Sequence, residues 1–150
     1  MELLILNIGI VACLLLMYVT GVFIFAQILK DNSVMDIFYG PAFFVTSYLF
    51  LVITDTNSIL STIIVICIGL WASRLGIRIF LKNFGNPEDA RYAAWREEWM
   101  QKGRWYFLIR SYLQINLLQG FIILIVLLPF IISVSNPGVL SPVTTILGSL

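Results

Sequence analysis

The chain has 150 residues, of which 60% are hydrophobic and only 11% are charged, and its mean hydropathy is +0.98. A soluble domain carries about 25% charged residues, so this composition excludes a secreted globular domain, a disordered tail and a nucleic-acid-binding module. The net charge of +1 indicates no acidic partner. We therefore expect an integral membrane protein that is surrounded by lipids and has no nucleic-acid partner.

The sequence contains no histidine, and its two cysteines, Cys13 and Cys67, lie inside apolar runs. The lack of histidine excludes nucleophile–histidine–aspartate sites and two-histidine metal motifs within the chain, so we expect no metal site. Free cysteines in apolar surroundings are usually small buried residues. We therefore expect both cysteines to be buried, and we expect no disulfide framework.

Four apolar runs are long enough to cross a bilayer, which takes about 20 mostly apolar residues. They cover residues 3–29, 37–53, 58–81 and 107–134, and a fifth run, 139–150, is too short to cross. The sequence therefore predicts an all-α fold, an integral membrane helical bundle of four transmembrane helices plus a partial fifth, within a single domain. Pro41 is expected in the first turn of the second helix, where proline is tolerated.

Positive charge predicts the orientation of these helices. One of the nine Lys and Arg residues, Lys30, lies between the first two runs, and the other eight lie between positions 74 and 110. Loops rich in Lys and Arg stay in the cytoplasm. We therefore expect the N-terminus to lie outside and the 82–106 loop to be cytoplasmic.

The 82–106 loop is predicted to contain one helix, over about residues 87–102. Asn86 suits the N-cap position, and Pro87 suits the first helical position. Gly103 follows as a plausible stop. The predicted fold therefore includes an amphipathic cytoplasmic helix between the third and fourth spans.

Three aromatic residues of this helix, Tyr92, Trp95 and Trp99, recur at i, i+3 and i+7 and so form one stripe. Trp and Tyr favour the boundary between membrane and water. We therefore interpret Trp95 and Trp99 as interfacial anchors of a helix that lies flat on the cytoplasmic face.

Basic residues also form a stripe on the third span, where Arg74, Arg78 and Lys82 recur at i, i+4 and i+8. Snorkelling to the lipid headgroups accounts for Lys82 and Arg78. Arg74 lies about two turns deeper, where an Arg costs several kcal/mol unless it faces protein or water. The stripe is either a snorkelling, orientation-setting feature, or a site for a phosphate or for the carboxylates of Glu88 and Asp89.

Polar residues within the spans mark one further region. Asp36 lies at the start of the second span, where it caps the helix or has a function. Gln114, Asn116 and Gln119 cluster at the start of the fourth span. Amide side chains in hydrocarbon need partners, so this face is expected to look inward, towards other helices or towards a ligand in a substrate cavity.

Several sequence motifs occur in one order along the chain. Residues 33–40 (SVMDIFYG) resemble the signature SVxDxxWG, residues 71–75 (WASRL) resemble WxxRL, and residues 83–92 (NFGNPEDARY) resemble RNxGxxEDxRY. Arg96 and Trp99 follow, and the match continues through residues 111–114, 118–120 and 128–129. Together, over about residues 33–130, these motifs resemble the N-terminal half of the steroid 5-alpha-reductase-like membrane family, in its bacterial-type branch.

The resemblance implies an oxidoreductase acting on CH–CH groups, which uses NADPH to reduce a carbon–carbon double bond conjugated to a ketone in a lipid or sterol-like substrate. Hydride would add to the β-carbon while a hydrogen-bonding acid stabilises the enolate oxygen. By match, Asp36 and Tyr39 would be catalytic, and Gln114 and Gln119 would line the substrate cavity. The cofactor-binding residues would be Arg74, Glu88, Asp89, Arg91, Tyr92 and Arg96.

The chain also departs from the family pattern. Tyr39 replaces the usual Trp, Lys82 stands where Arg is common, and the RHPNY-like cofactor motif of the family's C-terminal half is missing. We therefore expect the N-terminal part of a longer protein, with an incomplete NADPH site and no activity by itself, which needs its missing C-terminal half or a partner membrane subunit. The alternative is a non-enzymatic small membrane scaffold or accessory subunit. A small transporter is less favoured, because no pair of broken spans occurs.

Overall fold

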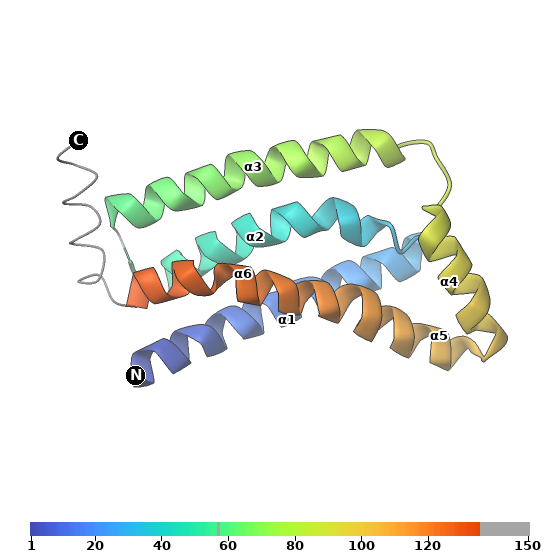
Figure 1. Ribbon diagram of the computed structural model, residues 1–150, viewed down its shortest axis with the longest axis horizontal. Helices are drawn as coiled ribbons and strands as arrows, with labels where there is room; N and C mark the ends of the chain where they lie inside the picture. Colours follow the sequence, from blue (N-terminus) through green and yellow to red (C-terminus); the bar gives the residue numbers. More distant parts are fainter. Residues whose placement is uncertain (57, 136–150) are drawn as a thin grey trace.

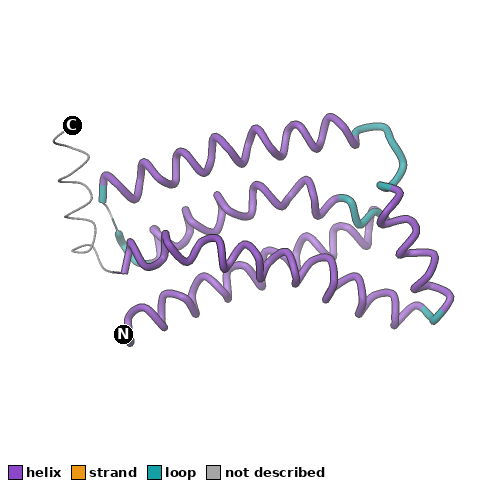
Figure 2. The backbone as a smooth tube through the Cα atoms, in the orientation of Figure 1, coloured by secondary structure: helices purple, strands orange, loops and turns teal. Residues whose placement is uncertain are grey.

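The computed structural model describes residues 1–56 and 58–135, and all regular secondary structure in these residues is helical (Figures 1 and 2). The elements are α1 (Glu2–Leu29), α2 (Val34–Ile53), α3 (Ile59–Asn83), α4 (Ala90–Gln101), α5 (Arg104–Arg110), the π-helical segment η1 (Ser111–Leu117) and α6 (Leu118–Ser135). The last three elements follow one another without a break and form one long helix. The all-α prediction is confirmed, and the partial fifth helix predicted over 139–150 lies outside the described residues.

Four helices in the described residues are long and apolar enough to cross a membrane: α1, α2, α3 and the continuous helix Arg104–Ser135. This is the architecture of a multi-pass membrane protein. Successive spans run in opposite directions, so the start of α1 and the end of α6 lie at one end of the bundle, while α4 lies at the other end (Figure 1). At the first end, Asn7 Nδ2 donates a hydrogen bond of 2.8 Å to Ser135 Oγ.

Helix α2 lies between α3 on one side and α1 and α6 on the other (Figure 1). Small residues let α2 and α3 approach closely. A Cβ atom added to Gly40 would lie 3.0 Å from the carbonyl oxygen of Ala72, and one added to Gly76 would lie 3.3 Å from the carbonyl oxygen of Ile37. Because α3 packs mainly on α2, much of its remaining surface is open.

The start of α2 corrects one prediction. The helix begins at Val34 rather than at residue 37, so Pro41 lies inside the helix and not in its first turn. The helix begins early because Asp31 organises the preceding turn, where its Oδ1 accepts a hydrogen bond of 2.8 Å from the backbone N–H of Ser33. The apolar run begins only after this polar turn, so it predicts a helix that starts three residues too late.

The start of α4 corrects a second prediction, because the helix begins at Ala90 rather than at residue 87. Asp89 is the N-cap, and its Oδ1 accepts a hydrogen bond of 3.0 Å from the backbone N–H two residues on. The predicted cap, Asn86, instead donates 2.7 Å to the carbonyl oxygen of Lys82 at the end of α3. Asn and Asp are equally good caps, so residue type alone does not choose between them.

The aromatic stripe of α4 faces the bundle. Tyr92 and Trp99 are only 5% and 3% exposed and belong to one core cluster with Val19 and Met35. Trp95 is half-buried and stacks on Trp99, with ring centroids 5.6 Å apart. The interpretation of Trp99 as an interfacial anchor is therefore wrong, because α4 uses this stripe to cover apolar side chains at the ends of α1 and α2.

The cysteines also differ from their prediction. Cys13 and Cys67 are both exposed on the surface of the bundle, although they lie inside apolar runs. In a membrane helix the outward face is as apolar as the core, because lipid is as apolar as the packed side chains. Apolar neighbours in the sequence therefore do not predict burial for a residue of this class of protein.

Candidate functional site

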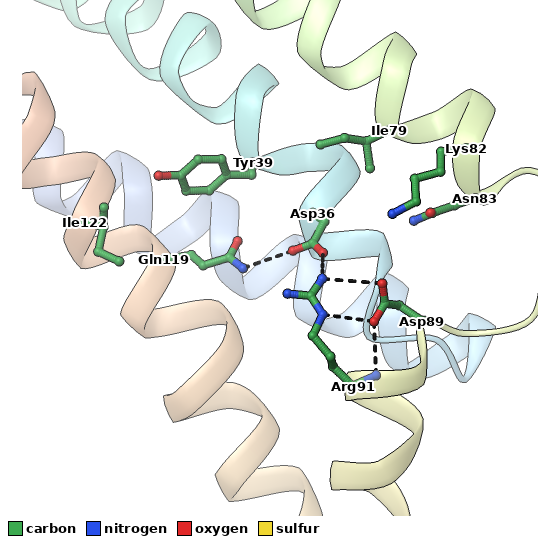
Figure 3. Close-up of a pocket in the computed structure, with 9 residues that line it drawn as sticks. All are labelled: Asp36, Tyr39, Ile79, Lys82, Asn83, Asp89, Arg91, Gln119 and Ile122. Atoms are coloured by element: carbon green, nitrogen blue, oxygen red, sulfur yellow. Dashed lines mark hydrogen bonds and ion pairs between the residues drawn. The ribbon is translucent and has the colours of Figure 1, made fainter.

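A polar pocket of about 460 Å³ lies at the α4 end of the bundle, between α2, α3 and α6 (Figure 3). It is lined by residues that are far apart in the sequence: Asp36, Tyr39, Ile79, Lys82, Asn83, Asp89, Arg91, Gln119 and Ile122. Two predicted catalytic residues, two predicted cofactor-binding residues and one predicted substrate-cavity residue are among them. The fold therefore brings together Asp36, Tyr39, Asp89, Arg91 and Gln119.

Asp36 is the centre of the polar network in this pocket. Its Oδ1 accepts a hydrogen bond of 2.7 Å from the Tyr92 hydroxyl and one of 3.3 Å from Gln119 Nε2, and its Oδ2 lies 3.5 Å from Arg91 Nη2. Asp36 lies in the first turn of α2, but the N-cap is Ser33. Asp36 therefore connects α2 to α4 and α6, and its interpretation as a helix cap is wrong.

Arg91 joins the carboxylates of Asp36 and Asp89 (Figure 3). Its Nε donates a hydrogen bond of 3.0 Å to Asp89 Oδ1, while its Nη2 faces Asp36. The hydrogen bond between the two side chains lowers the pKa of Asp89 and raises the pKa of Arg91. The Arg91 side chain is nevertheless 67% exposed, so the guanidinium is held in place while part of it faces solvent.

The Tyr92 hydroxyl and the Gln119 amide both donate to Asp36, but only Gln119 also has a polar atom that is left without a partner in the described residues. Burial, together with the hydrogen bond to Asp36, raises the pKa of Tyr92, so its phenol stays protonated and donates to that carboxylate. Gln119 donates to Asp36 through Nε2, but its buried Oε1 has no partner among the described residues. An unpaired buried acceptor is costly, and it lies beside the central carboxylate of the pocket.

Tyr39 lies one turn after Asp36 on the same face of α2, and its ring extends towards α6 (Figure 3). The ring packs edge-on against Phe43, with centroids 5.4 Å apart. In the part of the chain that the structure describes, the Tyr39 hydroxyl makes no hydrogen bond, although Tyr39 lines the pocket. It is therefore a free donor for a ligand.

Glu88 and Arg96 lie outside the pocket lining and form a brace behind it. Arg96 donates two hydrogen bonds to Glu88, with Nε–Oε2 and Nη2–Oε1 distances of 2.8 and 2.9 Å. Glu88 Oε1 also accepts 2.7 Å from the backbone N–H of Asn32, in the turn between α1 and α2. The guanidinium of Arg96 lies 4.9 Å from the ring centroid of Phe107. These contacts fix α4 to the rest of the bundle and so place Tyr92 against Asp36.

We expect Glu88→Ala to lower the free energy of unfolding by about 2 kcal/mol, because it leaves Arg96 unpaired where that side chain is only 25% exposed. The matched control is Glu98→Ala, whose partner Lys102 lies 3.5 Å away and is 54% exposed, so a change below about 0.5 kcal/mol is expected. Thermal unfolding in detergent and hydrogen exchange of α4 measure both effects. Equal effects of the two variants would contradict the brace.

The structure places two other predicted residues outside the pocket. Arg74 is exposed on α3, and Gln114 lies half-buried in η1. Four pocket residues are not among the predicted site residues: Ile79, Lys82, Asn83 and Ile122. The apolar pair carries no chemical signal in the sequence, whereas Lys82, which lines the pocket, belongs to the predicted basic stripe.

Among residues 1–56 and 58–135, no group of acidic or cysteine side chains is placed to bind a metal ion. Comparison with curated proteins and with solved structures finds no match. A family model described as a protein of unknown function (DUF1295) matches residues 8–149. That match covers nearly the whole chain and includes all of the pocket residues. The chain therefore belongs to the DUF1295 family.

Proposed function

We propose that the polar pocket is the substrate site of an NADPH-dependent membrane reductase, which reduces a carbon–carbon double bond conjugated to a ketone in a lipid or sterol-like molecule. The motifs of the chain and the relation of the DUF1295 family to steroid 5-alpha-reductases support this proposal. The observation that carries it is the free hydroxyl of Tyr39 in a pocket that is ordered around the carboxylate of Asp36.

The charges around the pocket suit the phosphates of a dinucleotide. Lys82 lines the pocket, is exposed and makes no ion pair within the described residues, and Arg91 is 67% exposed. Cations with free N–H groups bind phosphate oxygens strongly. Lys82 and Arg91 are therefore the residues of this chain that would hold NADPH, together with groups from a C-terminal continuation or a partner membrane subunit. The cofactor, when bound, supplies the hydride.

The protein side of the reaction consists of stabilising the charge on the substrate oxygen. As hydride adds to the β-carbon, negative charge moves to the carbonyl oxygen, and a donor that is already in place lowers the barrier. A proton from water would then add to the α-carbon and give the saturated ketone. Tyr39 would donate to the carbonyl oxygen, because its hydroxyl has no other partner among the described residues. Asp36 accepts hydrogen bonds from two neighbours and pairs with Arg91, so its proposed role is to position Gln119 and Arg91 rather than to contact the carbonyl.

The direction of the chain in the membrane follows from the same proposal. The α4 end carries Lys30 and the basic α4–α5 region, and positive charge marks the cytoplasmic side. NADPH is soluble and charged, so it reaches the pocket only from water. We therefore place the α4 end in the cytoplasm and the N-terminus outside.

The protein, with any C-terminal continuation that its gene encodes, would be purified in lipid nanodiscs and mixed with NADPH and a methyl enone. We expect oxidation of NADPH that depends on the enone, with one saturated ketone formed for each NADPH consumed, measured by absorbance and mass spectrometry. Stable co-purification with other membrane proteins, without NADPH binding or turnover, would reject the reductase and favour an accessory subunit.

A further inference from the structure

A second pocket, of about 570 Å³, follows the polar one along the same three helices. Its lining includes Phe43 of α2, Ile68 and Trp71 of α3, and Val126, Pro129 and Ser133 of α6. Nearly all of its lining is apolar, in contrast to the polar pocket at the α4 end. None of the proposed chemistry uses this pocket.

The two pockets lie on one continuous face of α6. Gln119 and Ile122 line the polar pocket, and Val126, Pro129 and Ser133 line the apolar one. These positions recur at i, i+3, i+7, i+10 and i+14, which is the spacing of one helical face. The walls of the two pockets are therefore successive parts of the same side of this helix.

The other two helices repeat this pattern. On α2, Asp36 and Tyr39 line the polar pocket, and Phe43 follows at i+7 in the apolar one. On α3, Lys82 lines the polar pocket, and Trp71, 11 residues or about three turns earlier, lines the apolar one. The same faces of α2, α3 and α6 thus line both pockets, which follow one another between α3 and α6; we call the two pockets together the α3–α6 groove.

Three aromatic rings connect the two parts of the α3–α6 groove. Tyr39 packs edge-on against Phe43, and Phe43 packs edge-on against Trp71, with centroids 5.4 Å apart in each pair. These contacts link Tyr39, which lines the polar pocket, to Phe43 and Trp71, which line the apolar one. Trp71, the first residue of the WASRL motif, therefore belongs to the wall of the apolar pocket.

The length and polarity of the α3–α6 groove restrict what it can hold. From Gln119 to Ser133 it extends about 21 Å, since an α-helix rises about 1.5 Å per residue. That is more than half of the bilayer's hydrocarbon thickness of about 30 Å. Among the lining residues, the charged side chains all lie at the α4 end, and Val126 and Trp71 are 56% and 48% exposed along its side. A compact polar metabolite would leave most of this length empty. A long amphiphile from the bilayer would place its polar head in the polar pocket and its apolar chain in the apolar one.

We propose that the α3–α6 groove holds the apolar tail of a long-chain lipid whose carbonyl head lies at Tyr39, and that this lipid enters sideways from the bilayer. The position of the head rests on the proposed function, but the position of the tail does not. The tail moves from lipid into a groove that is equally apolar, so the hydrophobic effect does not favour its binding. Its selection depends on shape and on contacts with the aromatic rings.

The test uses the full chain, with any encoded continuation, in nanodiscs. The probe is a palmityl-length methyl enone with a diazirine at the end of its tail, and the adducts formed on irradiation are mapped by mass spectrometry. We expect adducts on residues 64–71 and 126–133. The comparison probe, a phosphatidylcholine with a diazirine on its acyl chain, is expected to label the outer faces of all four spans.

A substitution that fills the groove gives the matched comparison. Ile68→Trp is expected to reduce labelling by the enone about tenfold, because the larger ring occupies the tail path. Ile66→Trp is the control, since Ile66 is 54% exposed and lies about 200° around the helix from Ile68; labelling within about twofold of wild type is expected there.

Three results would overturn the proposal. One is enone labelling that matches the phosphatidylcholine pattern or is unaffected by Ile68→Trp. Another is labelling concentrated on the pocket between α1 and α6, around Leu16 and Leu113. The third is a cross-link from the groove to a second copy or to a later part of this chain, which would show that protein fills it. Groove labelling without NADPH turnover would reject the reductase and support the tail site. NADPH turnover without groove labelling would support the reductase and reject the tail site.

Discussion

Replacing Tyr39 with Phe is expected to lower the rate of NADPH-dependent enone reduction by about 10²–10³-fold and to leave NADPH affinity unchanged. The substitution removes only the Tyr39 hydroxyl, which has no hydrogen-bond partner in the described residues. The ring keeps its edge-on contact with Phe43, so the helix packing is preserved. The effect should appear in kcat rather than in KM, because the hydrogen bond becomes stronger as charge develops on the substrate oxygen.

The control for this variant is Tyr48→Phe on the same helix. Tyr48 is 53% exposed and stacks on Phe44, away from the pocket, so its rate should equal that of the wild type. A Tyr39→Phe variant with full activity would assign the donor to another group. Tyr92 would be a poor substitute, because it is 5% exposed and already donates to Asp36.

The helices could be predicted from the sequence because their signal is local. A run of apolar residues has the length of a bilayer, and the four runs became the four spans of the bundle. The ends of α2 and α4 were predicted less well, because each depends on which polar side chain reaches the backbone. Asp31 and Asp89 are the residues that do so, and competing candidates such as Asn86 are equally suitable in type.

The site could be predicted only in part. The motifs include Asp36, Tyr39, Asp89, Arg91 and Gln119, which the fold brings to one pocket. No local pattern shows that Gln119 would reach Asp36 across 83 positions of sequence. The separation of Glu88 and Arg96 from the pocket also depends on the three-dimensional path of the α3–α4 loop.

The direction of the Trp stripe was predicted wrongly for a related physical reason. A helix at a membrane surface and a helix packed on a bundle end both need one aromatic face. The sequence pattern is the same in both cases, and only the contacts of Trp99 with the core distinguish them. Tyr92 belongs to the same stripe, so the packing that buries Trp99 also brings the Tyr92 hydroxyl to Asp36.

Replacing Arg91 with Ala is expected to weaken NADPH binding by about ten- to a hundredfold at low salt, and by less as the ionic strength rises. The substitution removes an exposed guanidinium, and it also leaves the carboxylates of Asp36 and Asp89 at the pocket without their shared cation. Both changes disfavour a phosphate. Arg91→Lys should fall in between, because an ammonium keeps the charge but lacks the planar group that bridges two carboxylates.

Fluorescence titration of NADPH against the nanodisc-embedded protein measures these affinities. Arg104→Ala is the control, because it removes the same charge from the same end of the bundle but lies outside the pocket lining. If both variants weakened binding equally, the effect would be a general attraction of the basic surface and not a site. A specific loss with Arg91→Ala, combined with unchanged enone labelling in the α3–α6 groove, would separate the cofactor end of the pocket from the path of the lipid tail.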